Sequence, residues 1–318
     1  MIIELWGVRG SLPAPTENTE YRHKVREIVQ RAIDQGIHSS DEIDPFFSKL
    51  PQNLQSIYGG NTTCVTVRSK SGKLYILDCG TGIRPLGDIL MSGNAGKGAE
   101  ELNIFITHTH WDHIQGIPFF KPIYIPGNVI NFHSGLTDLH DRLKYQQTER
   151  FFPVALDDMA STKTFHLIEE GNKYQLEDDL FVEGCRIKHP GGCMAYRFTE
   201  NGRSFIFATD AEFTGEYLEN LKPEQDAFFR NADLLVIDSQ YTLDEAFKKF
   251  DWGHTSYTMA INCAVQWKTR HLVLTHHEPA YSDEKLFSIS SDAVEHRIAL
   301  ESKFPVVHMA REGMRFEI

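Results

Sequence analysis

The segment Thr107–His113 reads T-H-T-H-W-D-H and places three histidines and one aspartate within seven residues, directly after the apolar run L-N-I-F-I. On a helix, His108 and His110 would point roughly 200° apart, so they could not hold one ion together. On an extended chain, residues two apart face the same side, so a preceding strand would deliver both imidazoles to one edge. Asp112 and His113 would follow after a turn. Imidazole nitrogen and carboxylate oxygen suit zinc, so the cluster predicts a metal site rather than a chance group on a surface loop.

Further histidines and acids stand at the ends of other strand-like runs. His189 follows E-G-C-R-I-K, Asp210 follows S-F-I-F-A-T, and His276 with His277 follows H-L-V-L-T. Alone, each side chain would more often be solvated or locally hydrogen-bonded, but beside the cluster they become candidate ligands, with the part of His277 left open. Two divalent ions about 3.5–4 Å apart, bridged by Asp210, could share one hydroxide. The seven candidate ligands are His108, His110, Asp112, His113, His189, Asp210 and His276.

Short apolar runs along the whole chain predict the strands that must carry these residues. Ser71-Gly72 and Asn201-Gly202 lie between alternating runs and indicate hairpin turns. Apolar residues at helical spacing predict four helices. We expect strands at Ile2–Val8, Thr62–Ser69, Lys73–Cys79, Leu102–Thr107, Val129–His133, Leu180–Lys188, Ala195–Thr199, Ser204–Thr209, Leu234–Asp238, Leu272–Thr275 and Val306–Ala310, and helices at about Glu20–Gln35, Leu136–Gln147, Thr255–Trp267 and Asp283–Ser302.

The chain has 318 residues, of which 41% are hydrophobic and 24% charged, and this composition predicts one large domain over residues 1–318. The net charge of −12 disfavours an extended nucleic-acid surface. No apolar run is long enough to cross a bilayer, and the N-terminal M-I-I-E-L-W-G predicts a first strand rather than a secretory signal. The five cysteines lack C-x-x-C spacing, which indicates reduced, mostly buried thiols in a cytoplasmic protein.

Two segments do not fit the pattern of strands. Residues 14–57 are polar, helical in pattern and bounded by prolines, which indicates a helical insertion that serves as a lid or a dimer contact. Residues 134–164 contain an amphipathic helix followed by an aromatic stop and are a second candidate lid. A homodimer is expected because apolar residues at helical spacing in the first insertion could face either the parent domain or a second subunit: Val25, Ile28, Val29 and Ala32.

Together these motifs resemble the metallo-β-lactamase superfamily over nearly the whole chain. The insertion at 14–57 is a departure from the family pattern. The resemblance implies an α+β fold, a four-layer αββα sandwich with two zinc ions at one edge. The matching segments are D-C-G-T-G (Asp78–Gly82), T-H-T-H-W-D-H-I-Q-G (Thr107–Gly116), H-P-G-G (His189–Gly192), A-T-D-A-E (Ala208–Glu212) and L-T-H-H (Leu274–His277).

Carried over by position, the resemblance also implies how the ligands divide. One metal would be held by His108, His110 and His189. The other would be held by Asp112, His113 and His276, with Asp210 between the two. Asp78 would orient the metal loop from behind the ligands. The cofactors would be two divalent ions, Zn²⁺ first, with Mn²⁺ or Fe²⁺ as alternatives because the same ligand types accept all three.

Two further segments resemble one branch of the superfamily, the tRNA 3′-processing endonucleases and related phosphodiesterases. D-S-Q-Y-T (Asp238–Thr242) and G-H-T-S (Gly253–Ser256) correspond to the segments that carry an acid–histidine pair. Asp238 would orient His254, which would protonate the leaving oxygen or bind the phosphate; its simpler role is a neighbour of a helix N-terminus. Asn61, in the opening that resembles small cyclic-nucleotide phosphodiesterases, could bind substrate or only form a turn.

We therefore expect a dinuclear metal-dependent phosphodiesterase that hydrolyses a small phosphodiester, preferably a 3′,5′-cyclic nucleotide, by attack of a metal-bridging hydroxide. Asp112 would bind one metal and orient the nucleophile, and His254 with Asp238 would assist the leaving group. The chain is acidic and lacks a Gly/Pro-rich basic arm for tRNA, which favours a small substrate. A lactonase or other acyl hydrolase is the first alternative, although acyl transfer does not need the acid–histidine pair. A non-catalytic metal sensor is the second, although the chain keeps all seven ligands.

Overall fold

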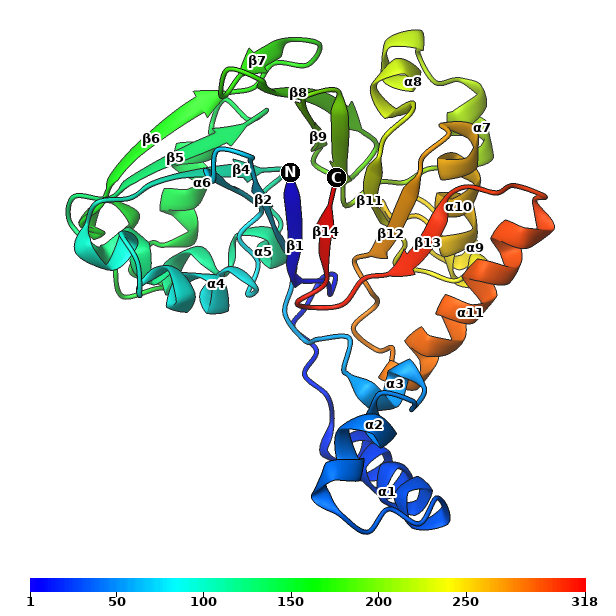
Figure 1. Cartoon of the computed structure of the whole chain (residues 1–318). Coiled ribbons are helices and arrows are strands. Elements are labelled where there is room, and N and C mark those ends of the chain that lie inside the picture. Colours follow the sequence, from blue (N-terminus) through cyan, green and yellow to red (C-terminus); the bar gives the residue numbers. More distant parts are fainter.

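Two β-sheets lie face to face between outer layers of helices in the computed structural model, which describes residues 1–318 (Figure 1). The sheets have the strand orders β14-β1-β2-β3-β4-β5-β6 and β13-β12-β11-β10-β9-β8-β7. This arrangement confirms the expected α+β sandwich. The strands are β1 (Ile2–Gly7), β2 (Cys64–Arg68), β3 (Leu74–Leu77), β4 (Glu101–Ile106), β5 (Val129–Ser134), β6 (Thr162–Leu167), β7 (Lys173–Gln175), β8 (Leu180–Ile187), β9 (Cys193–Glu200), β10 (Arg203–Ala208), β11 (Leu234–Asp238), β12 (His271–Thr275), β13 (Val306–Met309) and β14 (Arg315–Glu317).

The helices cover the outer faces of both sheets. The first sheet carries α4, α5 and α6, and the second carries α7, α8, α10 and α11 (Figure 1). No helix of this fold combines the length and the apolar character needed to span a bilayer. The helices are α1 (Asn18–Asp34), α2 (Ile43–Phe47), α3 (Gln52–Gln55), α4 (Ile83–Leu90), α5 (Trp111–Ile114), α6 (Leu139–Gln146), α7 (Gly215–Glu219), α8 (Pro223–Phe229), α9 (Leu243–Lys248), α10 (Tyr257–Gln266) and α11 (Asp283–Ala299).

Strand β11 shows how the sequence builds the layers. Its five residues, L-L-V-I-D, are all buried. Leu234 and Val236 pack into the core between the sheets, whereas Leu235 and Ile237 pack into the core beneath the helices. Because successive side chains of a strand point to opposite faces, a continuous apolar run is what a strand covered on both faces requires.

The edge that receives the candidate site is set by strand direction. Strands β3 to β6 run parallel to one another, as do β10 to β13. Parallel strands end at the same edge of a sheet, where ligands of α/β folds commonly bind. The histidines and acids predicted as ligands follow the ends of β4, β8, β10 and β12. The fold therefore brings segments far apart in the sequence to one edge.

Residues 14–57 contain α1, α2 and α3 and no strand, as expected for a helical insertion, and they project below the sandwich (Figure 1). A small apolar cluster of Phe46, Leu50 and Leu54 holds these helices together. In the second expected lid, residues 134–164, α6 buries Leu139 and Leu143 in the core of the first sheet. Its last residues already belong to β6. The lid and dimer roles of both segments stay predictions.

Candidate metal centre

The T-H-T-H-W-D-H segment leaves β4 in an extended conformation and then turns into α5. His110 is the residue before α5 and has extended backbone angles, while Asp112 and His113 lie in the helix. The turn is fixed from behind by Asp78, whose carboxylate accepts hydrogen bonds from the Thr107 backbone N–H and from its hydroxyl, both at 2.8 Å. The loop is thus anchored before any ion binds.

The structure brings all seven candidate ligands together in two groups. The first group consists of His108, His110, His189 and Asp210, whose ligand atoms lie within 4.8 Å of one another. The His189 Nε2 and His110 Nδ1 atoms are 3.0 Å apart. The Asp210 Oδ1 atom is 3.7 Å from Nε2 of His108 and of His189. These distances leave room for one ion between the three imidazoles and the carboxylate.

The second group consists of Asp112, His113, Asp210 and His276. Here Asp210 uses its other oxygen: Oδ2 is 3.0 Å from His113 Nε2 and 3.1 Å from His276 Nε2. The Asp112 Oδ2 atom lies 3.2 and 3.1 Å from the same two nitrogens. Asp210 therefore presents one carboxylate oxygen to each group, which is the geometry expected of a bridging ligand.

The electrostatics of these buried groups call for a cation. Burial, followed by the charge of His113, holds the pKa of His108 well below its ordinary value. Burial would also lower the pKa of His113, but the Asp210 and Asp112 carboxylates outweigh it and raise that pKa. The Nε2 atoms of both histidines are buried and have no hydrogen-bond partner. Such unpartnered nitrogens facing carboxylates fit the ligand set of a divalent metal site.

Several groups behind the ligands fix their orientation. Asp78 Oδ2 accepts a hydrogen bond from His113 Nδ1 at 2.8 Å, and the Gly253 carbonyl accepts one from His189 Nδ1 at 2.9 Å. Each of these imidazoles is thereby set with Nε2 toward the metal groups. The Ser11 backbone N–H donates to Asp112 Oδ2 at 2.7 Å. Sequence reasoning missed Ser11, since its contact is made by backbone and spans 101 positions of chain.

His277 lies outside both groups. Its Nε2 donates to the Ala310 carbonyl at 2.9 Å, and its ring packs edge-on against Tyr58. Burial, followed by the charge of Arg9, lowers the pKa of His277 to about 3. The neutral ring is therefore a core histidine, and of the two neighbouring histidines His276 is the one at the metal groups.

The acid–histidine pair lies next to the second group. His254 Nδ1 donates to Asp238 Oδ2 at 2.6 Å, and the His254 ring stacks on that of His276 with centroids 4.9 Å apart. Asp238 is fully buried, and its Oδ1 accepts hydrogen bonds from the backbone N–H groups of Gln240 and Thr255. The carboxylate is thus held rigidly and fixes the imidazole. Because His254 Nδ1 is occupied by this hydrogen bond, His254 Nε2 is the ring nitrogen that remains for proton exchange with a substrate.

The turn before His254 depends on two residues that sequence reasoning did not assign. Glu212, buried in the A-T-D-A-E motif, accepts a hydrogen bond from the Gly253 N–H at 3.1 Å. Gly253 has φ = +90°, and a Cβ there would lie 2.4 Å from His189 Nδ1. Only glycine fits this position, and its place beside His254 was the one available signal.

Asn61 has a structural partner. Its backbone N–H and its side-chain amide both donate to the Glu312 carboxylate, at 2.6 and 3.1 Å. Its carbonyl accepts hydrogen bonds from Val8 and Arg9. The substrate-binding role of Asn61 stays a prediction, since these contacts account for its side-chain amide without a ligand.

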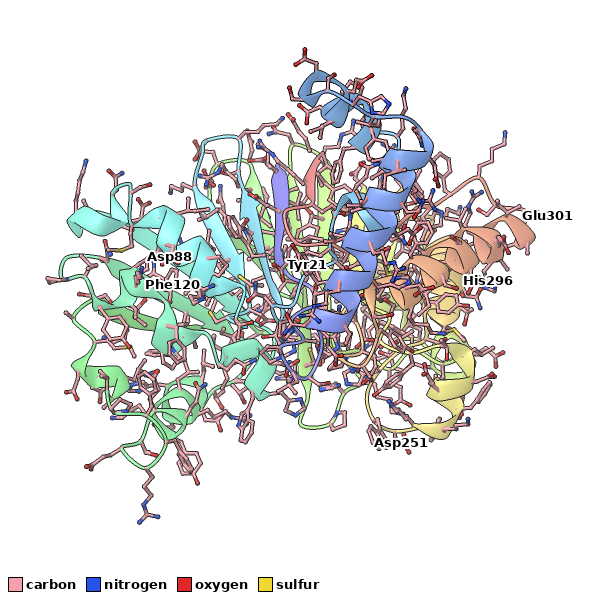
Figure 2. All side chains as sticks on the ribbon, turned by 90° about the horizontal axis from the view of Figure 1, so that it is seen from below. Tyr21, Asp88, Phe120, Asp251, His296 and Glu301 are labelled. Carbon is pink, nitrogen blue, oxygen red and sulfur yellow. The ribbon has the colours of Figure 1, made fainter.

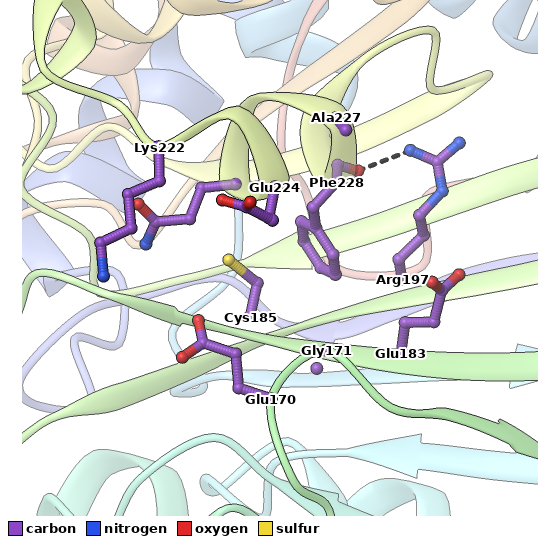
Figure 3. Close-up of a pocket in the computed structure, with 11 residues that line it drawn as sticks. Glu170, Gly171, Glu183, Cys185, Arg197, Lys222, Glu224, Ala227 and Phe228 are labelled. Carbon is purple, nitrogen blue, oxygen red and sulfur yellow. Dashed lines mark hydrogen bonds between the residues drawn. The ribbon is translucent and has the colours of Figure 1, made fainter.

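A separate cavity of about 570 Å³ opens between β8, β9 and α8 (Figure 3). Its walls carry Glu170, Arg197 and Cys185, and none of its residues belongs to the metal groups. Arg197 donates to the Phe228 carbonyl, and burial raises the pKa of Cys185 to about 12. Arg197 is thus engaged by the protein itself, and Cys185 offers this cavity a neutral thiol rather than a thiolate.

Comparison with known proteins agrees with this geometry. The family described as "Beta-lactamase superfamily domain" matches residues 75–277, which include all seven candidate ligands. Ribonuclease Z of Prochlorococcus marinus (strain MIT 9301) is 23% identical over 310 residues, covering 79% of this chain and 91% of that protein. Ribonuclease Z of Trichodesmium erythraeum is 24% identical over 333 residues, covering 83% and 95%.

Solved structures share the fold at low identity. Human tRNase Z, short form, has a TM-score of 0.60 and 18% identity and covers 100% of this chain and 99% of its own. Yeast PDE1 has a TM-score of 0.58 and 14% identity, covering 99% and 98%. The family match, the ribonuclease Z relatives and the paired groups of ligands lead to one conclusion: this chain is a metal-dependent hydrolase that belongs to the beta-lactamase superfamily.

Proposed function

We propose that this protein is a dinuclear metal-dependent phosphodiesterase that acts on a small phosphodiester, preferably a 3′,5′-cyclic nucleotide. One observation carries the proposal: Asp210 presents Oδ1 to one group of ligands and Oδ2 to the other, with His254 stacked on His276 beside the second group. Two ions fit this arrangement better than one. Zn²⁺ is the first candidate for both, given imidazole and carboxylate ligands.

The ligands would be divided as their positions suggest. His108, His110 and His189 would hold one ion; Asp112, His113 and His276 would hold the other; and Asp210 would bind both. When bound, the ions would supply Lewis acidity toward the phosphoryl oxygens and toward an attacking water. Asp112 is itself oriented by the Ser11 N–H, so the carboxylate can position that water without turning away.

His254 would act on the leaving oxygen. Asp238 accepts a hydrogen bond from the His254 Nδ1–H group, so the proton that His254 gives to the leaving oxygen must be carried at Nε2. Protonation of the leaving oxygen from this atom is general acid catalysis, which contributes about 10²–10⁴-fold in rate. An acyl hydrolase would not need this pair, which is why we favour phosphodiester chemistry over a lactonase.

Two observations bear on the substrate. The net charge of −12 supports a small substrate rather than a long nucleic acid. The ribonuclease Z relatives support a second candidate, endonucleolytic cleavage of an RNA precursor.

The five cysteines are free and buried, which supports a reducing, cytoplasmic compartment.

The first experiment measures metal content per chain and turnover of 3′,5′-cyclic nucleotides on one sample, for wild type and His254→Ala. We expect about two metals per chain in both proteins and a turnover about 10²–10⁴-fold lower in the variant. A precursor tRNA and a lactone are assayed separately as alternative substrates. Cleavage of the tRNA alone would support the RNA candidate, and turnover of the lactone alone would overturn phosphodiester chemistry. Less than one metal per chain would overturn the metal centre itself.

A further inference from the structure

A cavity of about 1090 Å³ borders the loop that carries four of the candidate ligands. Thr109 lines it and stands between two candidate ligands, His108 and His110. The opposite wall is formed by one face of α6, where Asp141 and Tyr145, and likewise Arg142 and Gln146, stand four positions apart. The cavity adjoins the ligand loop but includes none of the seven ligands, so it is a candidate site for a part of the substrate other than the phosphate.

The cavity is walled by aromatic rings that the fold leaves uncovered. Trp111, Tyr145 and Phe151 line it and are 80%, 71% and 68% exposed. The rings of Tyr145 and Phe151 meet edge-on with centroids 6.2 Å apart. Exposed apolar groups gathered in one place usually mark a binding site, and aromatic faces favour stacking of flat rings. The occupant we expect is therefore an aromatic ring.

The polar groups of the cavity favour a ring that donates hydrogen bonds. Arg142 is already engaged, since it donates to Asp138 and to the Thr109 hydroxyl. Gln146 is engaged as well, since its Nε2 donates a hydrogen bond to the Ile114 carbonyl and its Oε1 is buried out of reach of a ligand. Asp141 adds an exposed carboxylate. Asp138 is paired with Arg142, so Asp141 is the one charged group of the cavity wall without a partner, and its carboxylate matches the N–H groups of an amino-substituted heterocycle.

We propose that this cavity binds the nucleobase of the substrate by stacking it on Trp111, with the exposed Asp141 carboxylate accepting a hydrogen bond from an amino-bearing edge. The inference rests on the proposed phosphodiesterase function and adds a subsite for the base. Trp111 lies one residue from His110 and from Asp112, so stacking there would add binding energy, equally in the ground state and the transition state, to a substrate whose phosphate lies at the ligands.

The test compares adenosine 3′,5′-cyclic monophosphate with the ribose 3′,5′-cyclic phosphate that lacks a base, using metal-loaded wild type, Trp111→Ala and Trp111→Phe. Because stacking on one aromatic ring is worth ~1–3 kcal/mol, we expect Trp111→Ala to raise KM for the adenosine compound about 5- to 150-fold with kcat nearly unchanged. Trp111→Phe should retain most of the affinity. The constants for the abasic compound should not change.

The matched control is Phe304→Ala. Phe304 is 55% exposed and precedes β13, and since β11, β12 and β13 run parallel it lies at the edge opposite the ligands. The Phe304→Ala variant should keep the wild-type KM and kcat for both compounds. An unchanged KM for the adenosine compound in Trp111→Ala, or an equal rise for both compounds, would overturn the proposal, as would a loss of metal that explains the effect.

The second arm tests the hydrogen-bonding edge. We expect wild type to prefer the adenine cyclic nucleotide over the one that carries unsubstituted purine, which lacks the amino group, and Asp141→Ala to lose that preference. Equal use of both compounds by wild type would overturn the role of Asp141. If wild type hydrolyses no phosphodiester, the proposed function fails, and calorimetry with adenosine 5′-monophosphate tests the cavity alone. Weaker binding by Trp111→Ala than by wild type would then support the base subsite, and no binding by wild type would overturn it.

Discussion

The turn that precedes His254 is held by a buried acid, Glu212. Glu212 Oε2 accepts the Gly253 N–H at 3.1 Å, and Oε1 accepts the Asp251 N–H at 3.3 Å and the Lys188 ammonium at 3.1 Å. Gly253 in turn accepts the hydrogen bond that orients His189. One carboxylate therefore positions both a candidate metal ligand and the proposed acid without touching either.

We predict that Glu212→Ala lowers kcat by about 10-fold or more, because misplacing His254 by a fraction of an ångström weakens proton transfer. Loss of the acceptor should also lower the free energy of unfolding by about 1–3 kcal/mol. Glu212→Gln keeps one acceptor oxygen and should restore part of kcat. Lys188→Met, which removes the two ion pairs of the half-exposed Lys188 with Glu212 and Asp251 but keeps the Glu212 carboxylate, is the control. The proposed role is wrong if Glu212→Ala loses stability but keeps the kcat of wild type.

Among single residues, the sequence predicted best the candidate ligands that come directly after a strand. The H-x-H-x-D-H spacing predicted that His108 and Asp112 lie at the same edge. The position of Asp210 directly after an apolar run, which is β10 in the structure, marked it as a candidate ligand. Ser11 could not be recognised, because it holds Asp112 through a backbone N–H, which every residue type except proline offers. Glu212 lay within a quoted motif, but its partners are 39 and 41 positions away and only the fold brings them together.

Among the strands, the buried ones were predicted and the exposed or very short ones were not. The buried strands were predicted closely: the expected Leu234–Asp238 is β11, and Leu102–Thr107 differs from β4 by one residue at each end. The expectation missed β6, β7 and β14. Strands β6 and β7 are the edge strands of their sheets and contain no buried residue, so the apolar alternation that marks a strand is absent. Strand β14 has only three residues, and its pairing with β1 is a contact between the two chain ends.

Strand β5 carries a titratable group into the sandwich. His133 stacks on Phe105 with ring centroids 4.5 Å apart and donates Nε2–H to Asn103 at 3.1 Å. Burial, followed by the charge of His166, lowers the pKa of His133 to about 4. An unfolded chain has a histidine pKa near 6.5. Between these two values the unfolded state binds the proton more readily, so acid favours unfolding in this window.

We predict that the free energy of unfolding falls from pH 6.5 to pH 4 and that His133 contributes up to about 3 kcal/mol of that fall. Its contribution is fully present above pH 6.5. His133→Gln should be less stable at neutral pH but show a shallower fall, measured by urea unfolding at several pH values. The exposed His23, changed to Gln, is the matched control. Identical slopes for wild type and His133→Gln would contradict the prediction.

The whole molecule holds the insertion of residues 14–57 in a fixed position. The Lys24 ammonium lies 2.7 Å from the Asp283 carboxylate, and the Asp283 N–H donates to Glu20 at 2.6 Å. Both contacts join α1 to the first turn of α11. Figure 2, seen from below, shows α1 crossing in front of the sandwich, with Tyr21 near the middle of the view. The insertion is thus an anchored surface rather than a loose appendage.

A stripe of apolar side chains runs along the uncovered side of α1. Tyr21, Val25, Val29 and Ile33 follow one another at intervals of four residues and are 61%, 38%, 51% and 66% exposed. No residue of α1 is buried. Residues four apart share one face of a helix, so the stripe is continuous, and a continuous apolar face commonly marks a contact with another chain. This favours the dimer role of the insertion over the lid role.

We predict that the protein forms a homodimer through this stripe and that Val29→Glu shifts it to monomer, because a charge would be desolvated at the contact. Sedimentation velocity over a range of protein concentrations measures the shift. Ile298→Glu, at an exposed position of α11, should leave the dimer intact. If wild type stays monomeric throughout, the dimer is wrong and the lid role remains. In that case Val29→Glu should change the KM of the enzyme, since the stripe would have to close over substrate in the same chain.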